Sequence, residues 1–336
     1  MVKISKIVSV LFKKKFPLLR YILVGMGKNT KAYAALIFIC VVWGTTYLAI
    51  RVGVRHYPAF LFAGVRQTVS GIILITIALL LNRNKDLSRR NILKQMLVGF
   101  LMLTVGNGCV TWGEKTVPSG IAALICSIMP IFAVLFNLAG SQKEKFNFLI
   151  GAGMFLGTCS VFLIFRNSIS GLANSGYLLG IFVILLATSS WALGSIVNRK
   201  NVNPINPFFN SGLQLLFGGI FMLFISPAVD DLHHIILWDA DGLLSMAYLI
   251  VFGSVLAYTA YMYTLSKLPV GIATIYAYIN PLVAVVLGYF ILHEELNIYT
   301  ALAFTTIIAS VFMVNKGYRQ QHIISEIRIK SSEAVS

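Results

Sequence analysis

A single full charge lies well inside a long apolar stretch of this sequence: Arg66, within residues 60–81. It stands six residues after the start of the stretch, which is about 9 Å along an α-helix. An ionisable side chain in such surroundings is expected to serve a function, and the planar guanidinium suits an anionic group such as a carboxylate. The alternative is a helix-packing role, with the guanidinium satisfied by carbonyl oxygens. Arg51, in the first apolar stretch, is a weaker candidate of the same kind.

A polar stripe follows residues 95–113. Asn107, Thr111 and Glu114 are spaced i, i+4 and i+7, so they share one face of a helix. If the helix crosses a membrane, that face turns toward protein. It then either lines a cavity or forms a seam of hydrogen bonds between helices, and both interpretations stay open. Glu114 stands next to Lys115 at the edge of the stretch, where an ion pair between the two side chains is the ordinary expectation.

Aromatic side chains recur in the apolar stretches. Trp43 and Trp191 lie near the middle of theirs, whereas interfacial tryptophans stand at the ends, so these two either pack in the core or line a cavity. Tyr276 and Asn280 are four residues apart and share a helix face. Aromatic walls with few polar groups suit a small, partly apolar organic solute. The candidate substrate-binding residues are Trp43, Thr46, Arg66, Asn107, Thr111, Ser127, Trp191, Gln214, Tyr258, Tyr276, Tyr278 and Asn280.

Other groups that could do chemistry are few. All five histidines and all eleven carboxylates lie outside the interiors of the apolar stretches, which leaves Glu114 as the best candidate for proton coupling. The four cysteines show no metal-ligand spacing, so they are interpreted as packing residues. HEELN (293–297) lacks the second histidine of a zinc-protease motif, and no phosphate-binding loop of a nucleotide-driven pump is present. The sequence therefore predicts no metal, cofactor or catalytic residue. A membrane-embedded enzyme would need ionisable groups converging at one membrane surface, and the connections between the apolar stretches do not offer them.

Long apolar segments must position these residues. The chain of 336 residues is 58% hydrophobic and 11% charged, with a mean hydropathy of +0.84, which is more apolar surface than a soluble core can hide. About 20 apolar residues cross a hydrocarbon layer of about 30 Å as a helix. Ten such segments are predicted: 34–54, 60–81, 95–113, 119–139, 147–165, 177–197, 208–226, 243–265, 270–291 and 299–315. The longest connection is 227–242, so no soluble domain fits between them.

The charge balance agrees with a membrane protein. The net charge of +16 comes from 27 Lys and Arg against 11 Asp and Glu, which in a soluble protein would suggest nucleic acid. Here 22 of the 27 basic residues lie in the termini and in alternate connections, as the positive-inside rule predicts. We therefore expect no nucleic-acid partner and a multi-pass protein of the cytoplasmic (inner) membrane with both termini in the cytoplasm. The basic residues 1–31 either lie on the membrane face or precede a true start at Met26.

The chain also repeats itself. VPSGIAALICSIMP (117–130) matches LPVGIATIYAYINP (268–281) at six of fourteen positions, with an offset of 151 residues. Each copy ends in a proline, Pro130 or Pro281, which can open a kink in its helix. Nearer the start of each half the offset is 148, which pairs Trp43 with Trp191, Gly64 with Gly212, Arg66 with Gln214, and Gly71 with Gly219. Each half is therefore predicted to be a five-helix unit.

The two halves are predicted to be inverted. Five is an odd number, so a second copy enters the membrane from the side opposite to the first. The loops agree, because residues 82–94 hold five basic residues whereas their counterpart 227–242 holds none and has four aspartates. Inverted repeats around one central site recur in secondary transporters.

Several motifs of the sequence resemble those of a known family. VVWGTTYLAIRVGV (41–54), then Pro58, then FAGVRQTVSGIILI (62–75) are similar to the start of the EamA-like family of the drug/metabolite transporter superfamily. The third and fourth segments, joined through VPSGIAALI, are similar to that family as well. The resemblance covers roughly residues 32–315. It implies a 5+5 inverted bundle with a central cavity, alternating access, and export or exchange of small metabolites. Two departures stand out in the second half: WALGS in place of WGTT, and Gln214 in place of Arg66.

The prediction is thus an all-α polytopic membrane protein. Residues 32–165 form the first five-helix repeat and 177–315 the second, flanked by the basic segment 1–31 and a cytoplasmic tail, 316–336. The expected function is a secondary transporter of a small organic metabolite or amino-acid-like solute. The alternative is a lipid-linked flippase or another non-enzymatic membrane component on the same fold. The expected partners are the solute and the lipid bilayer, and a second copy of the chain is a further candidate.

Overall fold

The computed structural model describes residues 29–81, 86–117, 119–139, 147–165, 175–199, 207–232, 239–292 and parts of 298–320. Most of the predicted basic segment 1–31 and of the tail 316–336 lies outside the described residues. So does part of the tenth predicted segment.

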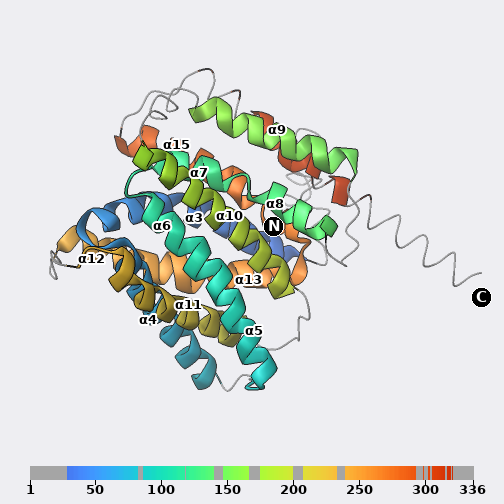
Figure 1. The fold of residues 1–336 in the computed structure, drawn as a ribbon. Helices are drawn as coiled ribbons and strands as arrows, with labels where there is room; N and C mark the ends of the chain where they lie inside the picture. Colours follow the sequence, from blue (N-terminus) through green and yellow to red (C-terminus); the bar gives the residue numbers. More distant parts are fainter. Residues whose placement is uncertain are drawn as a thin grey trace, which may run out of the picture.

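Every described element is a helix, and helices occupy the described part of each predicted segment (Figure 1). In the first half they are α3 (Thr30–His56), α4 (Ala59–Leu80), α5 (Arg89–Gly99), η1 (Phe100–Gly108), α6 (Cys109–Gly113), α7 (Ser119–Cys126), α8 (Met129–Ala139) and α9 (Phe148–Phe165). In the second half they are α10 (Ser175–Arg199), α11 (Pro207–Val229), α12 (Ala240–Tyr248), η3 (Leu249–Leu256), α13 (Ala257–Lys267), α14 (Val270–Ala273) and α15 (Tyr276–Leu292), and residues 305–314 are also helical.

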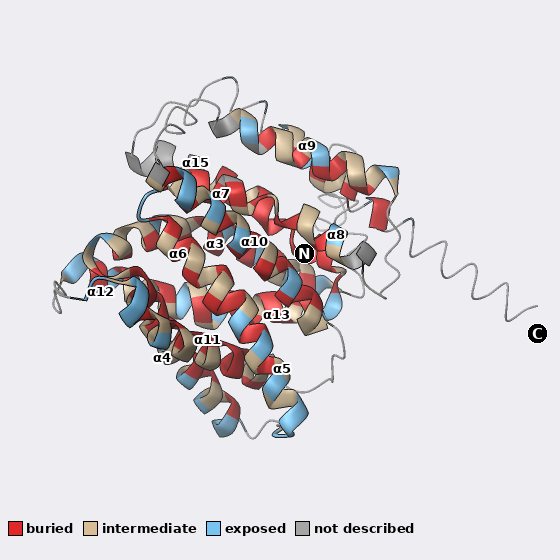
Figure 2. Cartoon of the chain, in the orientation of Figure 1, coloured by how far each residue is buried: buried red, intermediate tan, exposed pale blue. Residues whose placement is uncertain are grey.

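The outer surface of the bundle is apolar. Six helical stretches among the described residues are long and apolar enough to cross a membrane, and shorter apolar helices accompany them. Large hydrophobic side chains such as Leu80, Phe148 and Phe224 point outward and are about four-fifths exposed, while buried residues gather between the helices (Figure 2). Soluble proteins rarely expose so much contiguous apolar surface. Helices fit this setting because they satisfy their own backbone hydrogen bonds where no water is available.

Helices α4 and α11 join the two halves through a crossing of glycines. A Cβ atom placed on Gly71 would lie 2.5 Å from the backbone nitrogen of Leu216 and 2.9 Å from the carbonyl oxygen of Gly212, and one on Gly219 would lie 2.9 Å from the carbonyl oxygen of Gly64. Gly64, early in α4, approaches Gly219, and Gly71, later in α4, approaches the earlier Gly212 of α11. The two helices therefore run antiparallel. Since Gly64 is paired with Gly212 and Gly71 with Gly219 in the repeat, the two contacts exchange under a twofold rotation.

Both halves share two further irregularities. The third helix of each half contains a π-helical segment, η1 or η3, and such segments are frequent at functional sites. The fourth helix of each half is interrupted, at residues 127–128 between α7 and α8 and at residues 274–275 between α14 and α15. The first break ends two residues before Pro130, near the kink expected there, whereas α15 continues through Pro281 and the second break lies before Tyr276. These interruptions bring backbone ends into the middle of the bundle.

Contacts between the helix ends separate the molecule into two poles. At one pole, His56 at the end of α3 lies against Asp239, which caps α12, with 3.1 Å between Nδ1 and Oδ1. At the other pole, Lys94 in α5 donates to the carbonyl oxygen of Asn198 in α10 (3.0 Å). The first pole gathers connections predicted to lie outside, and the second gathers connections predicted to lie in the cytoplasm.

Candidate functional site

A cavity of about 90 Å³ lies in the middle of the bundle. Among the described residues that line it, twelve come from the first half and eleven from the second, all from the first four helices of each half. None of these described residues belongs to helix α9, which lies at the edge of the bundle (Figure 1). Since roughly 10–15 Å³ accommodates one water molecule, the cavity holds several waters or one small solute.

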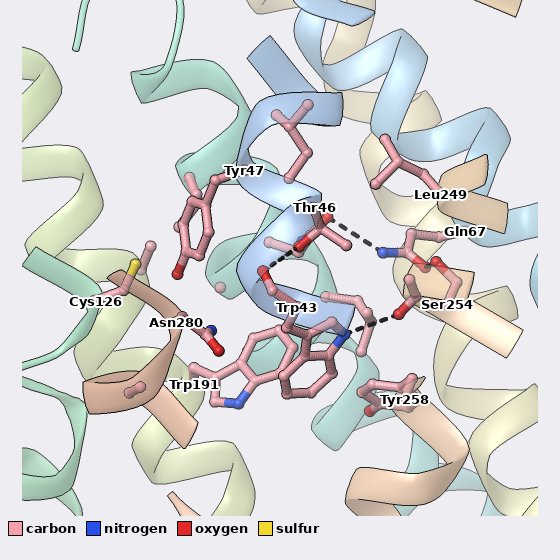
Figure 3. Close-up of a pocket in the computed structure, with 18 of the residues that line it drawn as sticks. Trp43, Thr46, Tyr47, Gln67, Cys126, Trp191, Leu249, Ser254, Tyr258 and Asn280 are labelled. Atoms are coloured by element: carbon pink, nitrogen blue, oxygen red, sulfur yellow. Dashed lines mark hydrogen bonds between the residues drawn. The ribbon is translucent and has the colours of Figure 1, made fainter. Parts of the chain in front are cut away.

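Aromatic rings form one wall of the cavity. The ring centroid of Trp43 lies 5.6 Å from that of Trp191 and 4.7 Å from that of Tyr276, both in T-shaped contacts. The indole nitrogen of Trp43 donates to the carbonyl oxygen of Gly253 (2.9 Å), which fixes its ring against the second half. The ring of Trp191 in turn lies against Tyr261, with 6.1 Å between the ring centroids. The two symmetry-related tryptophans therefore meet at the centre, with Asn280 on one side and Ser254 on the other (Figure 3).

Arg66 brings a positive charge to this cavity. Its side chain is 3% exposed, and its Nη2 donates to Oδ1 of Asn107. Gln67 donates to the same oxygen (3.2 Å) and accepts from the hydroxyl of Ser254 (3.0 Å), so the charge is held by side chains of both halves. The Nε–H of Arg66 has no partner. A buried guanidinium with an unused donor is suited to an anionic group.

The second half has a neutral polar pair beside the cavity. The hydroxyl of Tyr258, which lines the cavity, donates to Oε1 of Gln214 (2.7 Å). At the offset of 148 residues, Gln214 is the counterpart of Arg66. The site is therefore electrostatically asymmetric, because the first half supplies a cation where the second half supplies an amide.

Gln214 belongs to a polar network below the cavity. Its amide nitrogen donates to Gln95 and to Oδ1 of Asn198 (2.9 Å), and Gln95 donates to Asn91 at the start of α5 (2.8 Å). With the bond to Tyr258, this network links α5, α10, α11 and α13 between the cavity and the pole of Lys94.

The interrupted helices present their starts to the cavity. Met129 begins α8 and Tyr276 begins α15, and both residues line the wall. Helix starts carry a partial positive charge, which favours an anion as Arg66 does. Asn280 is 1% exposed, and its amide nitrogen donates to the carbonyl oxygens of Cys40 (3.1 Å) and Tyr276 (3.0 Å).

The structure brings eight of the twelve candidate residues together around the cavity and places four elsewhere. The eight are Trp43, Thr46, Arg66, Asn107, Trp191, Tyr258, Tyr276 and Asn280. Thr111 is buried against its own helix, where it donates to the carbonyl oxygen of Asn107 (2.9 Å). Tyr278 lies two residues after Tyr276, so it faces the opposite way and donates to the carbonyl oxygen of Met154 in α9 (3.3 Å).

The remaining two candidates also lie off the wall. Ser127 is buried in the break between α7 and α8, and the cavity is lined by its neighbour Cys126 instead. Gln214 holds the network described above, while Leu215 faces the cavity. Contact with a substrate stays a prediction for all twelve residues.

Several polar lining residues escaped the sequence-based prediction: Tyr47, Gln67, Thr188 and Ser254. Three of them could have been found from helical spacing. Tyr47 is four residues after Trp43, Thr188 three before Trp191, and Ser254 four before Tyr258.

Glu114 differs from its expected setting. The expected ion pair with Lys115 at the membrane edge is wrong, because Glu114 is completely buried whereas Lys115 is exposed and lies over the ring of Trp112 (5.9 Å). The carbonyl oxygen of Glu114 accepts from Arg51 in α3. Both oxygens of its carboxyl group lack a hydrogen-bond partner. A buried acidic side chain therefore lies inside the bundle, where the sequence indicated none.

Comparison with known proteins agrees with this arrangement. The model of the EamA-like transporter family matches residues 30–166 and again residues 178–316. The two matches fall on the two halves that share the glycine crossing and the cavity. They indicate that the chain is a duplication of one unit.

Individual proteins are similar over most of the chain. The Uncharacterized inner membrane transporter YedA of Escherichia coli (strain K12) is 35% identical over 287 residues, which cover 85% of this chain and 90% of that protein. The Uncharacterized transporter YvbV of Bacillus subtilis (strain 168) is 25% identical over 294 residues, covering 87% and 94%.

A solved structure described as "Crystal structure of protein" superimposes with a TM-score of 0.69 at 15% identity, covering 87% of this chain and 99% of that one, which supports the fold alone. The family matches extend over both halves and confirm the resemblance seen in the sequence motifs. The chain therefore belongs to the EamA-like transporter family of the drug/metabolite transporter superfamily and is a membrane transporter, not an enzyme.

Proposed function

We propose that the protein is a secondary transporter that moves a small organic solute with an anionic group, such as a carboxylate, by alternating access. The observation that carries this proposal is the unused Nε–H of Arg66 in a cavity walled by Trp43, Trp191 and Tyr276. The guanidinium would bind the anionic group, and the rings would contact an apolar or aromatic body. An α-amino acid or a simple organic acid has this combination.

An inverted arrangement of the two halves supports alternating access. The equivalent helices α4 and α11 run antiparallel, and their glycines make contacts that exchange under a twofold rotation. Two similar halves can exchange conformations and so give inward-open and outward-open states of similar energy around one site. We therefore extend the ten-helix, 5+5 inverted topology to the whole chain.

The charges support one orientation in the membrane. The pole that holds Lys94 and Asn198 gathers the connections predicted to be cytoplasmic, and the pole of His56 and Asp239 gathers the others. A location in the inner membrane is supported by the name of the Escherichia coli relative. In this orientation the network around Gln214 lies on the cytoplasmic side of the cavity, where we place one gate of an exporter or exchanger.

The cavity favours a small solute over a lipid-linked one. About 90 Å³ is far less than a lipid chain with its head group needs. No lining residue comes from α9, so the described wall is made by helices around the centre of the bundle and not by a lateral groove. The alternative of a flippase therefore has no specific observation in its favour.

Counterflow in proteoliposomes tests the proposed function. Vesicles containing the purified protein are preloaded with one member of a panel of small carboxylates and α-amino acids, and uptake of the radiolabelled compound is followed against matched amides and empty vesicles. A small metabolite thermal-shift screen on the detergent-solubilised protein narrows the panel beforehand. We expect saturable, protein-dependent exchange of carboxylates and much weaker exchange of the amides. Equal exchange of acids and amides would contradict an anion-binding role for the cavity.

Cysteine labelling tests the topology. In a variant with its native cysteines replaced by serine, a membrane-impermeant maleimide added to intact cells should label Ile236→Cys and not Asp86→Cys. Permeabilised cells should label both, which controls for reactivity. The physical reason is the charge difference between the acidic 227–242 loop and the basic 82–94 loop. Labelling of the Asp86→Cys variant alone in intact cells would reverse the topology.

A further inference from the structure

Glu114 is the least satisfied ionisable group in the described part of the chain. Its side chain is 0% exposed, and neither carboxyl oxygen has a hydrogen-bond partner. Buried carboxylates with a purely structural role are normally held by hydrogen bonds, because an unsatisfied buried charge is costly. The setting of Glu114 lacks such bonds and so requires another explanation.

Charged and titratable groups approach Glu114 from three other helices. Arg51 in α3 donates to its carbonyl oxygen, and both Arg51 and Arg66 in α4 interact with its carboxyl group electrostatically. Tyr47 in α3 and Cys126 in α7 also interact with it electrostatically. Arg66, Tyr47 and Cys126 line the cavity. Glu114 therefore lies beside the cavity. Its carboxyl group and a solute in the cavity would interact with the same positive charge, that of Arg66.

The position of Glu114 along its helix also places it close to the cavity. Val110 lines the cavity, and Glu114 follows it by four residues on the same face. Beyond Glu114 the chain reaches the exposed Lys115. The carboxyl group thus lies between the cavity and the pole of His56, one helical turn from the wall.

We propose that Glu114 is a proton-binding site coupled to the anion site at Arg66, a proposal that rests on the transport function proposed above. With the cavity empty, the carboxylate balances the nearby guanidinium groups. An anion bound at Arg66 brings a second negative charge into the same buried region. No hydrogen bond stabilises the ionised form of the Glu114 carboxyl group there. The carboxylate takes up one proton and becomes a neutral carboxyl group, so anion and proton are carried together.

Thermodynamic linkage gives the sign of the effect. If a bound anion strengthens proton binding at Glu114, protonation strengthens anion binding by the same factor. Affinity for an anion therefore rises as the pH falls, by up to about tenfold per pH unit when one proton is fully linked. A neutral solute of the same shape shows no such dependence. Replacing Glu114 by glutamine makes the site permanently neutral and removes the pH dependence.

The first experiment needs no transported substrate. Infrared difference spectra of the purified full-length protein are recorded during a pH titration, following the C=O stretch of protonated carboxyl groups. A carboxyl group without hydrogen bonds absorbs at higher frequency than a solvated one. We expect such a band in the wild type and in Asp239→Asn, whose carboxyl is partly exposed and paired with His56, and its absence in E114Q. A band unchanged in E114Q would overturn the proposal, whatever the transport assays show.

The second experiment measures binding. Phenylacetate is the anionic probe and phenylacetamide its neutral counterpart, titrated against tryptophan fluorescence between about pH 5.5 and 8, where phenylacetate stays ionised. We expect the dissociation constant for phenylacetate to fall on acidification in the wild type and to be constant in E114Q at the tight, low-pH value. Glu114→Asp, which can still titrate, should keep a pH dependence. A pH dependence preserved in E114Q would contradict the coupling, while absence of phenylacetate binding in every variant would contradict the anion site itself.

Discussion

Replacing Arg66 by glutamine lowers carboxylate transport by about 100-fold or more and leaves the protein folded. Loss of one partner of a buried, hydrogen-bonded charge contact costs about 2–5 kcal/mol, and about 2.7 kcal/mol corresponds to 100-fold. Glutamine is the informative substitution, because Gln214 occupies the equivalent place in the second half. The variant can still donate to Asn107 while it presents no cation. The measurement is kcat/KM for exchange of a radiolabelled carboxylate in proteoliposomes.

The control for Arg66 uses the charge of the solute. Transport of the matched amide, slow in the wild type, should change by less than about threefold in Arg66→Gln, since the amide makes no ion pair with the guanidinium. Arg66→Lys should recover only part of the carboxylate rate, because an ammonium group lacks the planar fork. An equal loss for acid and amide would show that Arg66 acts by holding helices together. That result would favour the packing role that the sequence left open.

Placing a methyl group on Gly71 strongly destabilises the protein. In Gly71→Ala the new Cβ would lie 2.5 Å from the backbone nitrogen of Leu216, a contact that only a shift of one whole helix can relieve. Overpacking of this kind costs about 1–3 kcal/mol, and Gly71→Leu should cost more. The measurements are the thermal unfolding midpoint in detergent and the monodisperse fraction in size-exclusion chromatography.

Gly253→Ala is the matched control for this prediction. Its added Cβ would meet side-chain carbons of Thr46 at 3.2 Å and Leu249 at 3.4 Å, and side chains can adjust where a backbone cannot. We expect a small shift of the midpoint for Gly253→Ala and a large one for Gly71→Ala. A midpoint for Gly71→Ala as high as that of Gly253→Ala would mean that α4 and α11 do not approach as closely as described.

The sequence predicts well what depends on spacing within one helix or between the two halves. Apolar segments of membrane-spanning length, the pairing of Trp43 with Trp191 and the buried charge of Arg66 are all visible as patterns. They lead to the correct family. Eight of the twelve residues that the sequence predicts around a common cavity do line it. The offset of 148 residues also relates the four glycines of the crossing, in which each glycine approaches a member of the other pair.

The errors arise where a neighbour in space decides the outcome. Glu114 stands at the end of an apolar segment beside Lys115, and no local pattern shows that α3 and α4 bring Arg51 and Arg66 next to it. Tyr278 is of the same residue type as Tyr276, but a separation of two residues turns its side chain to the opposite face of the helix. Thr111 follows the π-helical segment η1, and its hydroxyl is used by a backbone carbonyl one turn earlier.

The glycine crossing leaves a record of the chain's ancestry. After a gene is duplicated, each copy is free to drift unless something ties it to the other. At the crossing, every glycine abuts the other half, so a mutation in either copy disturbs a contact that both copies share. Arg66 and Gln214 occupy equivalent positions that are not part of the crossing, and there one copy carries a cation and the other an amide. The two copies are alike where they touch each other and differ at the cavity and in the network beside it.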